Sequence, residues 1–141
     1  MTAAAALAAA VLFVWLGMVL AISFVEAPLK FRAPGVTAQL GLGIGRLVFR
    51  ALNTAEIVFA LVLVIAACVG PVPGGAITAG AVAVVLLLAQ LALVRPRLNR
   101  RTGLVLAGED VPRSNAHHAY IALELAKVIA LLVTGVLLLA R

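Results

Sequence analysis

Charge is what this sequence has least of. Only 11% of its 141 residues are charged and five are acidic, whereas 65% are hydrophobic. Soluble domains are closer to half apolar and a quarter charged, and a chain this short has too little interior to hide so much apolar surface from water. The composition therefore excludes an ordinary soluble domain. It predicts a protein whose main solvent is a lipid bilayer.

Other scarce features exclude further classes. The single cysteine, Cys68, rules out an intramolecular disulfide. The first apolar run has no basic segment before it and is longer than the apolar part of a typical signal peptide, so we expect a retained membrane helix. Polar and apolar residues do not alternate between turn signals as they do in the strands of a membrane β-barrel.

Long apolar runs are what the sequence has in abundance. They predict helices at about 2–26, 42–69, 76–94 and 116–140, each long enough to cross a hydrocarbon core of ~30 Å. Pro28 and Pro34 are expected to end the first helix, "GPVPGG" the second and "RPRLNRR" the third. The predicted fold class is all-α: a single transmembrane domain, residues 1–141, that forms an integral membrane four-helix bundle.

Basic residues concentrate in the first and third connections, residues 27–41 and 95–115, while the second connection is uncharged. Two spans separate these connections, so both lie on the same side of the membrane, and the positive-inside rule makes that side the cytoplasm. Both termini are therefore predicted on the non-cytoplasmic side, in a bacterial cytoplasmic (inner) membrane. Topology accounts for the net charge of +6, so no nucleic-acid partner is predicted. The arginines of the third connection are candidate contacts for anionic lipid: Arg95, Arg97, Arg100 and Arg101.

Ionisable groups inside the apolar runs form two stripes. Positions 46, 50, 53 and 56 share one face of the second helix, and positions 117, 120, 124 and 127 share one face of the fourth. Such groups are costly in lipid and should turn inward, so we expect Glu56 and Glu124 to pair with Arg50, Lys127 or His117. The predicted ligand- or proton-binding residues are Glu26, Arg46, Arg50, Asn53, Glu56, His117, Tyr120, Glu124 and Lys127.

Three functions remain open from the sequence. The favoured one is a cytoplasm-facing intramembrane pocket that binds or transports a small ligand, ion or proton, in a protein that forms a homo-oligomer. The first alternative is an accessory subunit of a larger membrane complex, in which the polar stripes hold subunits together. The stripes also have a purely structural interpretation, in which Glu124 and Lys127 neutralise each other at i, i+3. The second alternative is a membrane metalloprotein or enzyme that uses the Glu/His layer.

Motifs for chemistry are weak. Glu26, Glu56, His117 and Glu124 are ligand types suited to iron, manganese or zinc, but the Glu-x-x-His signature of di-iron bundles does not occur. His117 and His118 are neighbours on one helix, which does not suit haem ligation from two facing helices. No catalytic residue and no cofactor is strongly implied, and the sequence favours a role other than catalysis.

The segment "SFVEAPLKFR", residues 23–32, resembles the first-helix motif of a family of small membrane proteins typified by transmembrane protein 205. The residues that match are Ser23, Phe24, Ala27, Pro28, Phe31 and Arg32. Glycines before the second helix (Gly41, Gly43 and Gly45) and a histidine at the start of the last helix (His117 or His118) are further points of likeness. The resemblance implies four helices and an integral membrane location, but no activity.

Overall fold

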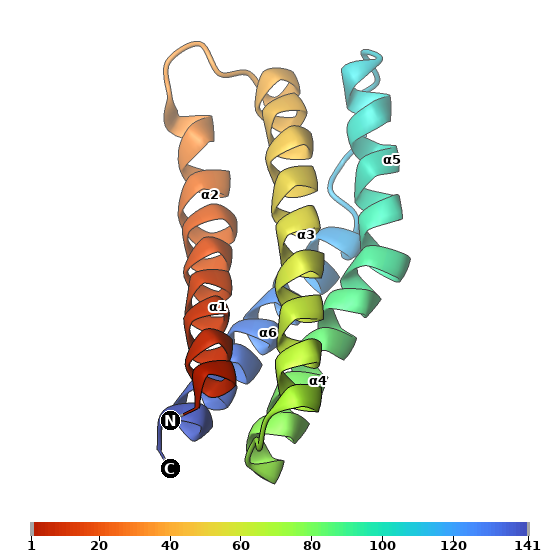
Figure 1. The fold of residues 1–141 in the computed structure, drawn as a ribbon. Helices are drawn as coiled ribbons and strands as arrows, with labels where there is room; N and C mark the ends of the chain where they lie inside the picture. The colour runs from red at the N-terminus through yellow and green to blue at the C-terminus, as the bar shows by residue number, and fades with distance from the viewer. Residues whose placement is uncertain (1, 141) are drawn as a thin grey trace.

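The computed structural model describes residues 2–140, and every regular element in that range is a helix (Figure 1). The first span joins α1 (Ala3–Val19), the π-helix η1 (Leu20–Glu26), α2 (Ala27–Leu29) and the short 3₁₀ helix η2 (Lys30–Arg32). The second is α3 (Ala38–Val69). The third joins α4 (Gly74–Ala89), the π-helix η3 (Gln90–Val94) and α5 (Arg95–Leu106), and the fourth is α6 (Asn115–Leu139). All four are long and apolar enough to cross a membrane, which confirms the predicted all-α class.

The first and third spans continue past Pro28 and Pro96, where they were expected to end, whereas the first span does end before Pro34, at Arg32. In each, a π-helix comes immediately before the proline-containing segment: η1 before Ala27–Pro28, and η3 before Arg95–Pro96. The residue before each proline donates its N–H five residues back, Ala27 to the Ile22 carbonyl and Arg95 to the Gln90 carbonyl. This wider turn shifts the carbonyls that a proline ring meets in a regular α-helix, so the chain stays helical past Pro28 and Pro96.

The four spans pack as a bundle in which α6 contacts α4 and α1, and α1 contacts α3. The middle of the bundle is filled by fully buried side chains such as Leu12, Trp15 and Leu131. Gly135 lets α6 approach α1 closely, because a Cβ there would lie 2.6 Å from Phe13 Cζ and 2.8 Å from Leu12 Cδ2. Small residues at helix contacts are typical of membrane bundles.

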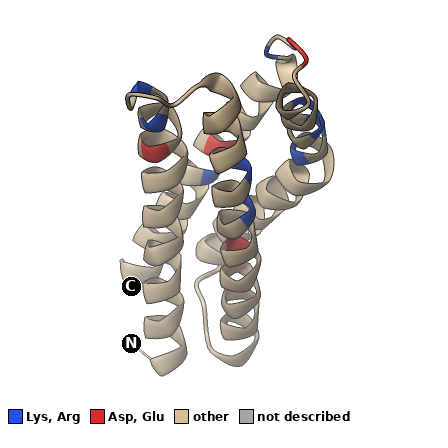
Figure 2. Cartoon of the chain, turned by 90° about the horizontal axis from the view of Figure 1, so that it is seen from above, with Lys and Arg blue, Asp and Glu red and all other residues tan. Residues whose placement is uncertain are grey.

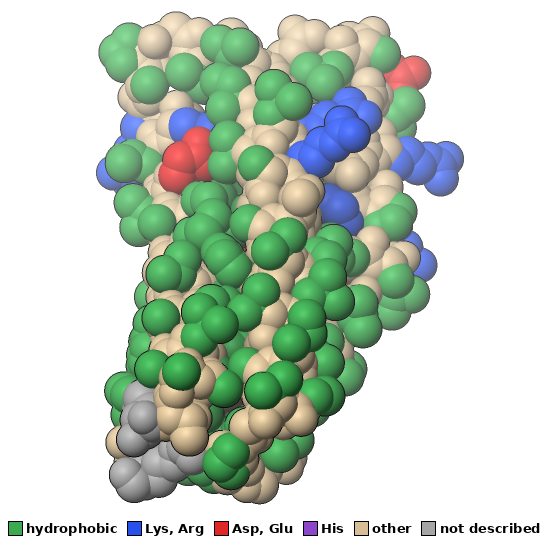
Figure 3. Space-filling model, in the orientation of Figure 1, with side chains coloured by type: hydrophobic (Ala, Val, Ile, Leu, Met, Phe, Trp, Pro, Cys, Tyr) green, Lys and Arg blue, Asp and Glu red, His purple; other side chains and the backbone are tan. Residues whose placement is uncertain are grey.

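Within residues 2–140, charged side chains lie toward one end of the bundle. Figure 2 shows lysine, arginine and acidic residues away from the end at which the chain begins and finishes. On the face shown in Figure 3, the described side chains farther from them are mostly hydrophobic. Large apolar side chains on the outer helix faces, among them Leu61, Ile65 and Val85, are exposed to an extent typical of surfaces that face lipid. The end where α1 begins and α6 finishes is thus the apolar end, and the loop after η2 and the α5–α6 connection lie at the charged end (Figure 1).

Candidate functional site

A buried ionic network lies between the spans. The Lys127 ammonium on α6 is 2.5 Å from Glu56 Oε2 on α3 and 2.6 Å from Glu124 Oε1 on its own helix. It also donates a hydrogen bond of 2.7 Å to Gln90 Oε1 at the start of η3. All four side chains are at most 1% exposed. We call Glu56, Gln90, Glu124 and Lys127, with the donors described next, the buried network.

Side chains of other residues donate the remaining hydrogen bonds to the carboxylates of Glu56 and Glu124. Glu56 Oε2 accepts a hydrogen bond of 2.8 Å from Trp15 Nε1 on α1, and its Oε1 accepts one of 3.0 Å from Asn53 Nδ2. Glu124 Oε2 accepts one of 2.7 Å from Ser23 Oγ on η1, and its Oε1 accepts one of 3.3 Å from Gln90 Nε2. All four spans therefore contribute to the buried network, and each of its ionised atoms has a partner. Buried charges are tolerated in proteins only under that condition.

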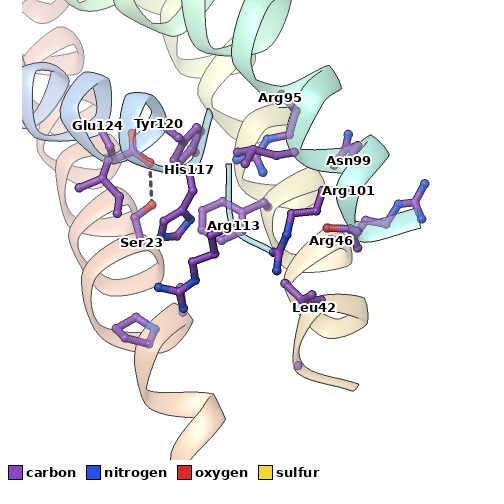
Figure 4. A pocket seen from close by; sticks show the side chains of 18 of the residues that line it. Ser23, Leu42, Arg46, Arg95, Asn99, Arg101, Arg113, His117, Tyr120 and Glu124 are labelled. Atoms are coloured by element: carbon purple, nitrogen blue, oxygen red, sulfur yellow. Dashed lines mark hydrogen bonds between the residues drawn. The ribbon is translucent and has the colours of Figure 1, made fainter. Parts of the chain in front are cut away.

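A pocket of about 390 Å³ lies on the charged side of the buried network. Glu124 belongs to both, so it connects the network to the pocket floor. The pocket lies among η1, α2, η2, α3, α5 and α6 (Figure 4). Its polar lining comprises Ser23, Lys30, Arg46, Arg95, Asn99, Arg101, Thr102, Arg113, His117, Tyr120 and Glu124, and apolar side chains such as Phe24, Leu42, Phe49, Leu98 and Ile121 cover the rest.

The pocket carries a surplus of positive charge. Its lining includes five permanently basic side chains, Lys30, Arg46, Arg95, Arg101 and Arg113. Glu124 is the one carboxylate among the lining residues, and it shares the single charge of Lys127 with Glu56. Lys30 also pairs with Glu26, yet the basic side chains still outnumber these carboxylates. In Figure 4, Ser23 and Glu124 lie on one side, Arg46, Arg95 and Arg101 on the other, and Arg113 and His117 between them. An arrangement of this kind attracts anions.

Two glycines on α3, Gly41 and Gly45, make space for the side chains of Phe31 and Lys30. A Cβ at position 45 would lie 2.9 Å from Lys30 Nζ, and one at position 41 would collide with the Phe31 ring. The side chain of Lys30 is only 11% exposed as a result of this packing, and its Nζ lies 3.7 Å from Glu26 Oε2. Gly41 and Gly45 thus allow η2 side chains to fold over α3 at the pocket.

The structure gathers part of the predicted site and leaves part outside. Asn53, Glu56, Glu124 and Lys127 meet in the buried network, and Arg46, His117, Tyr120 and Glu124 line the pocket. Lys127 is the partner of both buried carboxylates, whereas Arg50 is exposed and lines neither region. Glu26 pairs instead with Lys30, one turn away. His118 is exposed, so His117 is the histidine that faces the pocket.

Several residues of the site were not predicted. Trp15, Ser23 and Gln90 form hydrogen bonds in the buried network, and Arg113 lines the pocket. Gln90 had a readable signal, since an amide inside an otherwise apolar span should seek a polar partner. Trp15 had another, because the only tryptophan lies in the middle of a span rather than at the membrane interface, where its N–H would reach water.

The arginines predicted to contact lipid separate into two pairs. Arg97 and Arg100 are exposed and outside the pocket, and for them the prediction stands as before. Arg95 and Arg101 line the pocket. Arg101 donates hydrogen bonds to the backbone carbonyls of Val111 and Pro112, which fixes the connection between α5 and α6.

The candidate metal ligands are dispersed. Across residues 2–140, no three histidine, cysteine, aspartate or glutamate side chains form a group that could hold a metal ion. Glu56 and Glu124 meet at Lys127, which supplies the positive charge that a metal would supply.

Comparison with known proteins adds no relative: no protein-family model, no curated protein and no solved structure matches this chain. The likeness of residues 23–32 to the family of transmembrane protein 205 stays a prediction. In the structure that segment contributes Ser23 to the buried network and Phe24, Pro28 and Phe31 to the pocket wall.

Proposed function

We propose that this chain is an integral membrane protein that binds a small anion in the basic pocket. The single observation that carries the proposal is the charge of the pocket lining, which has five basic side chains and one carboxylate, Glu124. Cations held close together repel one another, and the repulsion is stronger where little water enters. A bound anion removes that repulsion, so binding energy is available to negatively charged ligands in particular.

The proposed orientation follows from the same basic residues. They lie at the end formed by the first and third connections, so the positive-inside rule places the pocket at the cytoplasmic side and both ends of the chain at the other. The anion would then enter from the cytoplasm or from the inner leaflet of the bilayer. A bacterial cytoplasmic membrane is the proposed location.

Binding is favoured over free passage by the buried network. Glu124 forms part of the pocket floor, and beneath it Lys127 joins α3, η3 and α6 through contacts of 2.5 to 2.7 Å. Passage of an ion across the bundle would require these contacts to separate in an apolar interior, which is costly. Transport would therefore require a conformational change in addition to binding.

A charge-matched comparison tests the proposal. Purified protein in an uncharged detergent is titrated calorimetrically with octyl phosphate and with octylammonium, and empty micelles serve as the blank. The wild type should bind octyl phosphate and not octylammonium. Arg46→Gln/Arg113→Gln removes two charges from the pocket and should weaken binding about tenfold, because it removes charge-assisted contacts. Arg97→Gln/Arg100→Gln removes two charges outside the pocket and should bind as the wild type does.

Two results would contradict anion binding. One is equal heat from octyl phosphate and octylammonium, which would mean that the apolar chain alone drives association. The other is an equal loss of affinity in the two double variants, which would mean that net charge acts without the pocket.

A further inference from the structure

The guanidinium of Arg95 differs from the other cations of the pocket in how it is held. Its centre lies 4.7 Å from the ring centroid of Phe49 on α3 and 4.4 Å from that of Tyr120 on α6. The two rings are themselves 5.8 Å apart and nearly perpendicular, at 86°. Contacts with two aromatic rings restrict the guanidinium without using any of its N–H groups, because rings interact with the charge rather than with the donors.

Two of the three donor nitrogens of Arg95 are buried and without partners. Nε and Nη2 are both inaccessible to solvent, and neither forms a hydrogen bond with any group in residues 2–140. None of the ion pairs found in that range involves Arg95 either. A buried donor without a partner costs about 1–3 kcal/mol, and more when the group is charged. This arrangement therefore calls for an acceptor in the pocket that Arg95 lines.

The two unpartnered nitrogens share one edge of the guanidinium plane. That edge presents two parallel N–H groups and matches two oxygens of one carboxylate or phosphate group. Arg101 shows the same edge in use on this chain: its Nε and Nη2 both donate to the Val111 carbonyl, at 3.1 and 3.0 Å. Arg101 holds a loop in this way, whereas in Figure 4 Arg95 extends from α5 toward Tyr120 within the pocket.

Resting on the proposed function, we infer that Arg95 is the residue that binds the anion, through a two-pronged contact from Nε and Nη2 to the oxygens of a carboxylate or phosphate. The apolar wall formed by Phe24, Leu42, Leu98 and Ile121 takes the carbon chain attached to that group. The ligand class is thus an amphiphilic oxyanion. Its source is either a lipid phosphate or a free acid, which have the same binding chemistry.

The backbone around Arg95 fits this role. Arg95 follows η3 and precedes Pro96, and its N–H bonds to the Gln90 carbonyl. Gln90 is also a member of the buried network, since its side chain bonds Lys127 and Glu124. The π-helical turn therefore fixes Arg95 relative to the pocket floor. Such turns are frequent at functional sites.

The test separates geometry from charge. Arg95→Lys keeps the positive charge and loses the paired donors, and Arg97→Lys makes the same change at an exposed position two residues on. In uncharged detergent, Arg95→Lys should bind octyl phosphate and octanoate about tenfold more weakly than the wild type, and Arg97→Lys should bind both as the wild type does. Unchanged binding by Arg95→Lys overturns the inference but leaves anion binding in place. Failure of the wild type to bind either anion overturns both.

A second measurement, by NMR, uses the wild type and therefore does not depend on whether a variant at position 95 folds. In wild-type protein labelled with ¹⁵N at arginine Nε, the Arg95 signal is identified by its shift in Phe49→Leu, which removes one of the two rings. Octyl phosphate should move that signal more than any other arginine signal. A larger response from an arginine outside the pocket would contradict the inference.

The source of the ligand is read from two arms of the same titration. Binding of octyl phosphate in lipid-free detergent, with no competition from phosphatidic acid in nanodiscs, assigns the site to a free acid. Displacement of octyl phosphate by phosphatidic acid, and not by zwitterionic lipid, assigns it to a lipid phosphate. Either result is consistent with the Arg95 contact. If zwitterionic lipid displaces octyl phosphate as well as phosphatidic acid does, the site is not selective for anions.

Discussion

The buried network and the pocket are built from the same residue types, yet they differ in how completely the charges are paired. In the network, Lys127 directs its donors to Glu56, Glu124 and Gln90, and every carboxylate oxygen has a donor. In the pocket, cations outnumber the lining carboxylate and Arg95 leaves two buried donors without a partner. A structural element needs all of its buried charges to be paired, whereas a binding site has charged groups left free for a ligand.

Position in the bundle explains the difference. The ionised side chains of the network lie where all four spans meet and are at most 1% exposed, so an unpaired charge there is very costly. The pocket lies toward the charged end, where water, headgroups or a ligand can complete the contacts of its cations. Glu124 takes part in both regions, so the two are in direct contact. Variants on either side of it should therefore separate stability from binding.

The largest expected effect is that of Lys127→Met. It keeps an unbranched apolar chain but leaves Glu56 and Glu124 facing each other with no cation between them. Removing one partner of a buried ion pair costs about 3–5 kcal/mol, and we expect the free energy of unfolding to fall by that amount. Equilibrium unfolding in mixed micelles of SDS and uncharged detergent, followed by tryptophan fluorescence, measures the change.

A neutralised variant is the control for Lys127→Met. Lys127→Met/Glu56→Gln/Glu124→Gln removes all three charges while it keeps side-chain volume, and it should recover most of the lost stability because no isolated charge remains. If the triple variant is as unstable as Lys127→Met, packing rather than charge is what Lys127 provides.

The next effect concerns the end of the network that faces away from the pocket. Trp15→Phe keeps most of the ring but removes the Nε1–H that donates to Glu56 Oε2 at 2.8 Å. Both residues are 0% exposed, so no water replaces the donor, and stability should fall by about 1–3 kcal/mol. Loss of the same amount from Trp15→Phe in a Glu56→Met background, which offers no acceptor to the indole N–H, would mean that the hydrogen bond to the carboxylate is not the cause. The double-variant cycle makes that comparison, read by circular dichroism.

A smaller effect is expected at the end that faces the pocket. Ser23→Ala removes the hydroxyl that donates to Glu124 Oε2 at 2.7 Å. Ser23 is half-buried and lines the pocket, so water can take its place, and the loss should be about 0.5–1.5 kcal/mol. Thermal unfolding of Ser23→Ala beside Trp15→Phe checks the order. A larger loss at Ser23 than at Trp15 would show that the pocket end of the network is the drier one.

The sequence predicts the fold well because the bilayer imposes one strong requirement. Apolar runs of sufficient length must become helices, since a backbone in lipid has no other way to satisfy its polar groups, and the four runs are indeed helices. The ends of the spans were harder to predict. The usual rule, which assumes α-helical bonding, predicts helix ends at Pro28 and at the segment RPRLNRR, whereas the π-helical turns before Pro28 and Pro96 let the helix continue.

Only those site residues that share one face of a helix could be predicted from their spacing in the sequence. The stripe from His117 to Lys127 and the pair Asn53 and Glu56 face inward as their spacing indicates. Arg50 belongs to the same stripe but is exposed near the charged end, where a long cation reaches water or headgroups. The sequence predicts Arg95 only as a lipid contact in a connection, since nothing in the sequence reveals that Phe49 and Tyr120, from two other helices, enclose it.

The smallest expected change in stability belongs to Arg46→Gln, and it makes the contrast with Lys127 sharpest. Arg46 is exposed at the pocket among other cations, so its removal relieves repulsion and the free energy of unfolding should change by no more than about 0.5 kcal/mol. Octyl phosphate binding should nevertheless weaken, and less so at high salt, because the lost attraction is screened there. Arg50→Gln, one turn along the same helix and outside the pocket, should change neither quantity. If Arg46→Gln instead lowers stability as Lys127→Met does, the pocket cations belong to the structural network, and the division between a paired core and an unpaired binding site is lost.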